Sequence, residues 1–291
     1  MSDNSFDKKF VYDYNGGASS SNNDRWRSNL SLHVEQSLTV GTGTDKSDAT
    51  ATNGQYALKT GNKTTASGVN STAMGLQAEA THAQAVAFGN LTNANAEQAT
   101  AFGHSTTANA AQATAWGNQT NANAVQATAF GNSSTASAAQ STAFGNSSTA
   151  SATNATALGD TTTASGVDSR AWGKNTFARD NDATAFGESC DAKAARSTAF
   201  GKSTIARGIN NTVFGDTNDI SGVTNTAWGT NNNIDTDSSF STVFGINNSL
   251  VNGRNVKVMS ENSTVNAVRN TLVDGSGHTV TNVKEAIIAG L

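Results

Sequence analysis

The 291-residue chain has no proline, a single cysteine and few charged side chains. A chain of this length usually carries about fifteen prolines, and their absence favours a fold in which nearly every backbone N–H is needed for strand pairing. A lone cysteine, Cys190, excludes an intrachain disulfide framework and a cysteine-based zinc site. Charged residues make up 14% of the chain and the net charge is −4, without a basic cluster, which argues against a nucleic-acid partner.

Large apolar side chains are also scarce, because Val, Leu, Ile and Phe make up only about 16% of the chain. Chains below roughly 20% seldom bury enough apolar surface to fold alone. No stretch approaches the ~20 apolar residues of a membrane helix, and the first ten residues lack the apolar core of a signal peptide. We therefore expect neither membrane insertion nor export by the general route.

Glycine recurs every 14 residues from Gly61 to Gly229, and the next step, to Gly245, is 16 residues. We number each unit from its glycine as position 0. Two runs of period-2 alternation, separated by turn-rich gaps, predict two short strands per unit, whereas helical spacing of apolar residues is absent. The prediction is an all-β parallel roll, or solenoid, in which each 14-residue unit forms one turn and pairs with the next.

The alternation assigns the faces of this roll. Positions 3, 5, 7, 10, 12 and 14 are small and are expected to line a thin interior, while positions 4 and 6 are polar and face solvent. Position 13 points outward and yet is large and apolar, which would leave a patch larger than a monomer tolerates. We therefore expect an obligate oligomer that buries this column: Phe88, Phe102, Trp116, Phe130, Phe144, Leu158, Trp172, Phe186, Phe200, Phe214, Trp228 and Phe244.

The repeated unit resembles the YadA-like head repeat of trimeric autotransporter adhesins. The units at 131–145, 145–159 and 159–173 match it almost position for position, and the resemblance covers about 57–245 well and 246–290 loosely. It implies a left-handed coil and a homotrimer in which the position-13 column faces the threefold axis. It also implies a role as a spacer and display scaffold. We expect an adhesive protein with no enzymatic activity and no cofactor.

The chain departs from the autotransporter plan because no signal peptide, heptad stalk or membrane-strand set is recognised in it. We therefore expect a fibre or spike of a virion, such as a bacteriophage tail or head fibre. The alternative is the excised head of a bacterial surface adhesin that binds host cells or matrix. The expected divisions are 1–56 for attachment and capping, 57–245 for the regular roll and 246–291 for an irregular tip.

Within these divisions, residues 1–27 are expected to dock on a baseplate or capsid protein and 28–56 to cap the first turn. The tip is the candidate for contact with a host receptor, whose identity the sequence does not give. A partly disordered tail before a capping strand is the competing interpretation of residues 1–56.

Arg170 is a charged exception at position 11, where Thr is usual, and three copies would approach the trimer axis. Such a cluster needs carboxylates or anions, and Asp168 is one candidate partner; a bound anion and an outward-turned side chain are the alternatives. Cys190, at position 3, is expected to face inward and to be inert. The four histidines share no ligand spacing, so we expect no metal site.

Two other functions have weaker support. Asp180 with Asp182, or Asp191 with Glu188, lie close enough in the sequence to suggest glycoside cleavage, but no aromatic cluster accompanies them and we expect no enzyme. The hydroxyl and amide ladder of 107–109, 135–137, 149–151 and 163–165 resembles what an ice-binding surface would use, although charges interrupt it further along.

Overall fold

The computed structural model describes residues 37–40, 56–251, 257–261, 264–266, 272–274, 279–281 and 287–289. All of them belong to the unit Glu35–Leu291. The docking segment 1–27 and most of the capping segment 28–56 lie outside the described residues. Within the described part every regular element is a β-strand, and a long and a short strand alternate along the repeats, as the two period-2 runs predict.

The long strands form one sheet and the short strands form another. The strands of the first sheet are β1 (Ser37–Val40), β2 (Ala57–Thr60), β4 (Thr72–Met74), β6 (Val86–Asn90), β8 (Thr100–His104), β10 (Thr114–Asn118), β12 (Thr128–Asn132), β14 (Thr142–Asn146), β16 (Thr156–Asp160), β18 (Arg170–Lys174), β20 (Thr184–Glu188), β22 (Thr198–Lys202), β24 (Thr212–Asp216), β26 (Thr226–Thr230), β28 (Thr242–Ile246), β30 (Lys257–Glu261), β32 (Leu272–Asp274) and β34 (Ile287–Ala289). The strands of the second sheet are β3 (Thr65–Ala66), β5 (Glu79–Ala80), β7 (Asn93–Ala94), β9 (Thr107–Ala108), β11 (Asn121–Ala122), β13 (Thr135–Ala136), β15 (Thr149–Ala150), β17 (Thr163–Ala164), β19 (Phe177–Ala178), β21 (Asp191–Ala192), β23 (Ile205–Ala206), β25 (Asp219–Ile220), β27 (Asn233–Ile234), β29 (Ser249–Val251), β31 (Thr264–Asn266) and β33 (Thr279–Thr281).

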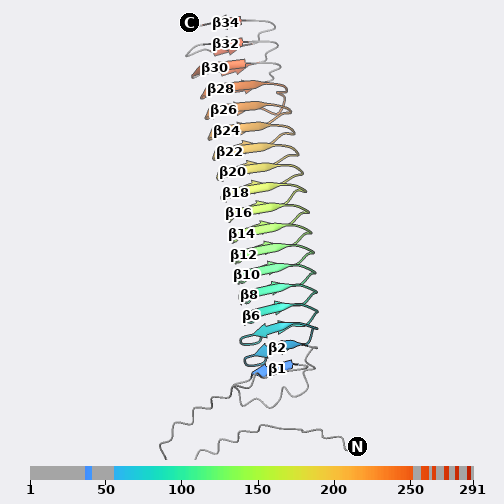
Figure 1. Ribbon diagram of the computed structural model, residues 1–291. Coiled ribbons are helices and arrows are strands. Elements are labelled where there is room, and N and C mark those ends of the chain that lie inside the picture. Colours follow the sequence, from blue (N-terminus) through green and yellow to red (C-terminus); the bar gives the residue numbers. More distant parts are fainter. Residues whose placement is uncertain are drawn as a thin grey trace, which may run out of the picture. The chain divides into compact units, whose positions relative to one another are not determined.

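Each turn pairs in parallel with the next, so equivalent residues stack in columns. Phe130 lies opposite Phe144 in the first sheet, and Thr135 lies opposite Thr149 in the second. Figure 1 shows the long strands following one another in chain order along the coil. The predicted parallel β-solenoid of 14-residue turns is thereby confirmed, while the left-handed sense of the coil stays a prediction.

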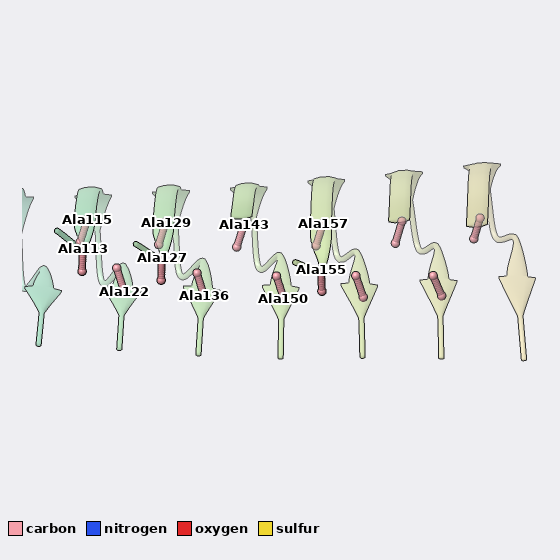
Figure 2. Close-up of a cluster of buried hydrophobic side chains, with 14 of the residues drawn as sticks. Ala113, Ala115, Ala122, Ala127, Ala129, Ala136, Ala143, Ala150, Ala155 and Ala157 are labelled. Atoms are coloured by element: carbon pink, nitrogen blue, oxygen red, sulfur yellow. The ribbon is translucent and has the colours of Figure 1, made fainter. Parts of the chain in front are cut away.

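The interior of the coil is narrow and is filled by small side chains. Alanines at positions 5 and 12, such as Ala136 and Ala143, have no exposed surface, and Figure 2 shows the alanines of the two sheets pointing into the space between the strands. Positions 3 and 10 are buried as well, as with Ser134 and Ser141. Position 7 lines the interior in only some turns: Gly68 and Gly166 are buried, whereas Ala110 and Ala124 are only partly buried, because this position lies at the corner that follows each short strand.

A glycine column lets consecutive turns approach each other closely at the end of each long strand. Gly131 has a φ of +122°, and a Cβ added to it would lie 2.0 Å from the carbonyl oxygen of Gly145. An L side chain is therefore excluded both by conformation and by space. This contact explains why the glycine of every regular unit is kept in register.

The interior becomes larger toward the carboxyl-terminal turns. Val213 and Ile220 replace alanines at positions 12 and 5 and remain fully buried. The one 16-residue step places its two additional residues between β27 and β28. Trp228 still lies opposite Phe244, so the insertion is absorbed at a corner and the columns continue beyond it.

Candidate functional site

The outer face of the long strands carries the large apolar side chains of position 13. Trp116 and Phe144 are 46% and 49% exposed, although the alanine that precedes each ring is fully buried. This alternation places the aromatic rings on the outside of the coil, where the period-2 pattern predicts them. That the rings form a subunit interface stays a prediction at this point.

The rings stack on one another in two blocks. Centroids of neighbouring rings lie 4.5 to 5.9 Å apart, within the range of favourable aromatic contacts. One block runs from Phe88 to Phe144 and the second from Trp172 to Phe244. Leu158 separates them, since it is the aliphatic member of the column between Phe144 and Trp172. The column is therefore continuous in apolar character but thinner at Leu158.

Arg170 begins β18, two residues before Trp172, and its side chain is exposed. Its neighbours in the adjacent strands are Thr156 and Thr184. The candidate partner Asp168 instead accepts a hydrogen bond from Asn154 Nδ2 at 2.9 Å. Within the described residues of one chain, no carboxylate lies within ion-pair distance of Arg170.

Asp160, at the far end of β16, carries a carboxylate that its own chain holds in place. Oδ1 accepts hydrogen bonds from Asn146 Nδ2 at 2.8 Å and from Thr161 Oγ1 at 3.1 Å. These two donors, and then the positive charge of Lys174, lower the pKa of the Asp160 carboxyl from its ordinary value. Asp160 is therefore a preoriented anion at the edge of the apolar face.

The outer face of the short strands is polar along the first turns. Asn95 donates to Asn109 at 3.2 Å and Asn109 to Asn123 at 3.1 Å, so the amides of this ladder bond one another. The threonine column continues from Thr149 to Thr163 and then ends at Phe177. The candidate ice-binding ladder is thus present over part of the coil, with the Asn109 amide and the Ser165 hydroxyl already hydrogen-bonded.

Charged side chains replace the ladder further along. Arg179 holds Asp191 through two guanidinium nitrogens, at 2.8 and 3.2 Å, and lies 4.5 Å from the centroid of the Phe177 ring. Arg207 pairs with Asp219 in the same way. These exposed pairs are each worth only about 0–1 kcal/mol, and the Asp219 pair raises the pKa of Arg207.

Cys190 is a free thiol that faces the interior, as predicted. Its Sγ lies 3.1 Å from the carbonyl oxygen of Gly201, and Thr204 Oγ1 donates to the sulfur at 3.1 Å. His82 Nδ1 lies 3.0 Å from Thr81 Oγ1 on the surface. In the part of the chain that the structure describes, no group of three or more His, Cys, Asp or Glu residues is arranged to hold a metal ion.

The carboxylates considered for catalysis lie in ordinary surface settings. Asp191 forms an ion pair with Arg179, and Lys193 Nζ lies 3.7 Å from Asp191 Oδ2. Asp180 Oδ1 accepts a hydrogen bond from the backbone N–H of Asn181 at 2.7 Å. The described part of the chain contains no helix that could cross a lipid bilayer.

Sequence reasoning missed the hydrogen bonds made inside the coil. In some turns position 3 donates across the turn to the glycine carbonyl: Ser148 Oγ lies 2.8 Å from Gly159 O, and Asn218 Nδ2 lies 2.8 Å from Gly229 O. The threonine hydroxyls at position 3 of other turns, such as that of Thr106, are buried without a hydrogen-bond partner among the described residues. The signal was available, because position 3 is a hydrogen-bonding residue in nearly every turn. It was interpreted only as a small residue.

Comparison with known families agrees with the repeat pattern. The family model for the YadA head domain repeat, which describes two copies, matches residues 66–92, 94–120, 122–148 and 136–161. These stretches cover less than half of the chain, and no curated protein matches it. YadA head domains are structural parts of surface-exposed adhesins and form homotrimers. The solenoid contains YadA head domain repeats, as its 14-residue pattern indicated.

Proposed function

We propose that the protein is a homotrimeric structural and adhesive fibre that projects from a surface. The observation that carries the proposal is the column of outward-facing position-13 side chains, which runs unbroken in apolar character from Phe88 to Phe244 and is exposed in eight turns and half-buried in the other four. A column of this kind is an interface without its partner, and YadA head domains assemble with copies of themselves.

The energetics support the same conclusion. Burying the exposed half of one such side chain contributes roughly 1 kcal/mol, so the column amounts to roughly 10 kcal/mol per chain. That is comparable with the whole stability of an ordinary domain. The coil interior, which is made of Ala, Ser and Thr over most turns, buries far less apolar surface per residue than an ordinary core. Trimer formation therefore supplies much of what the interior lacks.

The proposed setting is a virion, in which residues 1–27 attach to a baseplate or capsid protein and 246–291 contact the host surface. The alternative is display on a bacterial cell as the head of an adhesin, which the family match alone would favour. The roll serves both settings in the same way, as a stiff spacer that carries a recognition surface away from its support.

Labelling with antibodies against the folded trimer tests the setting. Gold particles along fibres of purified virions support the virion proposal, and labelling confined to the cell surface of a producing bacterium overturns it in favour of the adhesin. Virions produced after deletion of the gene for this chain are the control for nonspecific labelling.

A further inference from the structure

Arg170 differs from the other arginines of the described region because it has no hydrogen-bonding partner there. Arg179 and Arg207 each hold an aspartate with two nitrogens, and Arg196 Nε donates to the Oδ1 atom of Asn210 at 2.7 Å. Among the 14-residue turns, Arg170 is nevertheless the charged member of the column at position 11, beside the apolar face; Lys257 joins this column only beyond the 16-residue step. An exposed arginine there must be accommodated when this face is covered.

The apolar column narrows at the turn that adjoins Arg170. Leu158 lies next to Trp172 in the column, and it interrupts the two blocks of stacked rings. A leucine projects less far than a phenylalanine or tryptophan, so the column is thinnest one turn away from Arg170. Arg170, which is larger than the usual threonine, and Leu158, which is smaller than the usual aromatic residue, are therefore exceptions to the repeat in neighbouring turns.

Asp160 offers the complementary charge. Both hydrogen bonds to its carboxylate end on Oδ1, which leaves Oδ2 without a donor among the described residues. The carboxylate is thus fixed in orientation with one oxygen available. One residue, Gly159, separates it from Leu158, so it lies beside the thin part of the column.

Arg170 and Asp160 of one chain cannot meet each other. Arg170 lies opposite Thr156, whereas Asp160 lies opposite Lys174, so the two are four residues apart along the strand direction. At about 3.3 Å per residue this separation is about 13 Å, which exceeds the reach of an arginine side chain. Any pairing between these two groups must therefore join different chains.

A threefold arrangement brings such groups together. When the outer faces of the long strands surround the axis, the start of each long strand lies beside the end of a long strand in the next subunit, because the interface is heterologous. Arg170 is at the start of β18 and Asp160 is at the end of the preceding long strand, β16. Position 11 of one chain then faces the position-1 column of its neighbour. In that column Lys174 lies level with Arg170 and repels it, while Asp160 and Glu188 each lie one turn, about 4.8 Å, to either side. Of these two carboxylates, Asp160 is the one that adjoins Leu158.

We propose that Arg170 forms an intersubunit salt bridge with Asp160 of the partner subunit, over the thin part of the column at Leu158. The proposal rests on the homotrimer of the proposed function. It assigns a pairing role to a charge that would otherwise disrupt an apolar interface. It also predicts that these turns fix the axial alignment of the subunits, because the turns from 103 to 157 carry no Asp, Glu, Lys or Arg, are nearly identical and specify register weakly.

Subunit exchange between trimers carrying donor and acceptor dyes tests the pair. Arg170→Glu and Asp160→Arg should each accelerate exchange about tenfold or more, and the double variant should return it to within about threefold of the parent rate. Glu188→Arg is the matched control, because Glu188 occupies the same repeat position two turns along. Combined with Arg170→Glu, it should not restore the rate.

The outcomes separate this pair from the trimer itself. A parent chain that is monomeric in solution overturns the proposed function as well as the pair. If the parent is a trimer but the effects of Arg170→Glu and Asp160→Arg on the exchange rate simply add in the double variant, the salt bridge alone is overturned. A bound anion would replace the salt bridge if three results came together. Phosphate would slow exchange in the parent, this slowing would be lost in Arg170→Gln, and the double variant would not recover the parent rate.

Discussion

Asn218 and Asn232 stack on each other inside the coil, one turn apart. Asn232 Nδ2 donates to Asn218 Oδ1 at 2.9 Å, and the backbone N–H of Asn232 donates to the same oxygen at 2.8 Å. Both side chains are buried. The pair replaces the serine and threonine of earlier turns with groups that can bond both the next turn and the glycine carbonyl.

Replacing Asn218 with alanine should destabilise the protein by about 2–4 kcal/mol. The substitution removes several buried hydrogen bonds and leaves the Asn232 N–H and the Gly229 carbonyl without their partner. The midpoint of urea unfolding measures the loss. Asn233→Ala, at an exposed site in the next turn, is the control and should change stability by less than about 0.5 kcal/mol. Equal effects of the two substitutions would contradict the buried ladder.

Replacing Gly145 with alanine should destabilise the coil by at least about 2 kcal/mol. Its φ is +131°, and an added Cβ would lie 1.9 Å from the carbonyl oxygen of Gly159. Thermal unfolding followed by circular dichroism reports the change. Ser151→Ala is the control and should have little effect, because Ser151 is exposed at the corner that follows β15. If Gly145→Ala left the stability unchanged, consecutive turns would not be as close as described.

The sequence predicts the architecture of this protein well because one register is repeated many times. The glycine spacing gave the turn length, and the alternation around Phe130 and Phe144 gave the faces of the long strand. What it could not give was the behaviour of single exceptions. Leu158 and Arg170 both differ from the pattern, but their relation to each other becomes evident only from the strand register, which places them in adjacent turns. Position 7 was assigned to the interior in every turn although most of its residues are only partly buried or exposed, because alternation continues in the sequence where the backbone has already turned a corner.

Asp160 should titrate below its ordinary pKa of 3.8, since Asn146 and Thr161 donate to its carboxylate. Because the pKa is depressed in the folded state, this interaction stabilises the fold above the unfolded-state pKa and is lost as the pH falls through the folded-state pKa. Carbon-detected NMR titration of the carboxyl should show the pKa rising toward 3.8 in Asn146→Ala. Asn118→Ala, at the same repeat position two turns earlier, should leave it unchanged.

The Cys190 thiol should react with a thiol reagent such as DTNB only when the coil opens. Its sulfur is fully buried and lies against the Gly201 carbonyl and Thr204. The modification rate of the native protein should therefore be at least about a thousandfold below that of protein in denaturant, because folded domains open rarely. Rapid labelling of the native protein would place the thiol on the surface instead.

The mass of the protein in solution, measured by light scattering on a sizing column, tests the central claim most directly. Burial of the position-13 column in a homotrimer, the assembly that YadA head domains form, predicts a mass near three times the 29.7 kDa of one chain. The double variant Phe144→Ser/Phe200→Ser should shift this mass toward that of one chain. Val125→Ser, which changes an exposed apolar residue at a corner, should not. A parent protein that is a stable monomer would contradict the account, because the exposed rings would then have no partner.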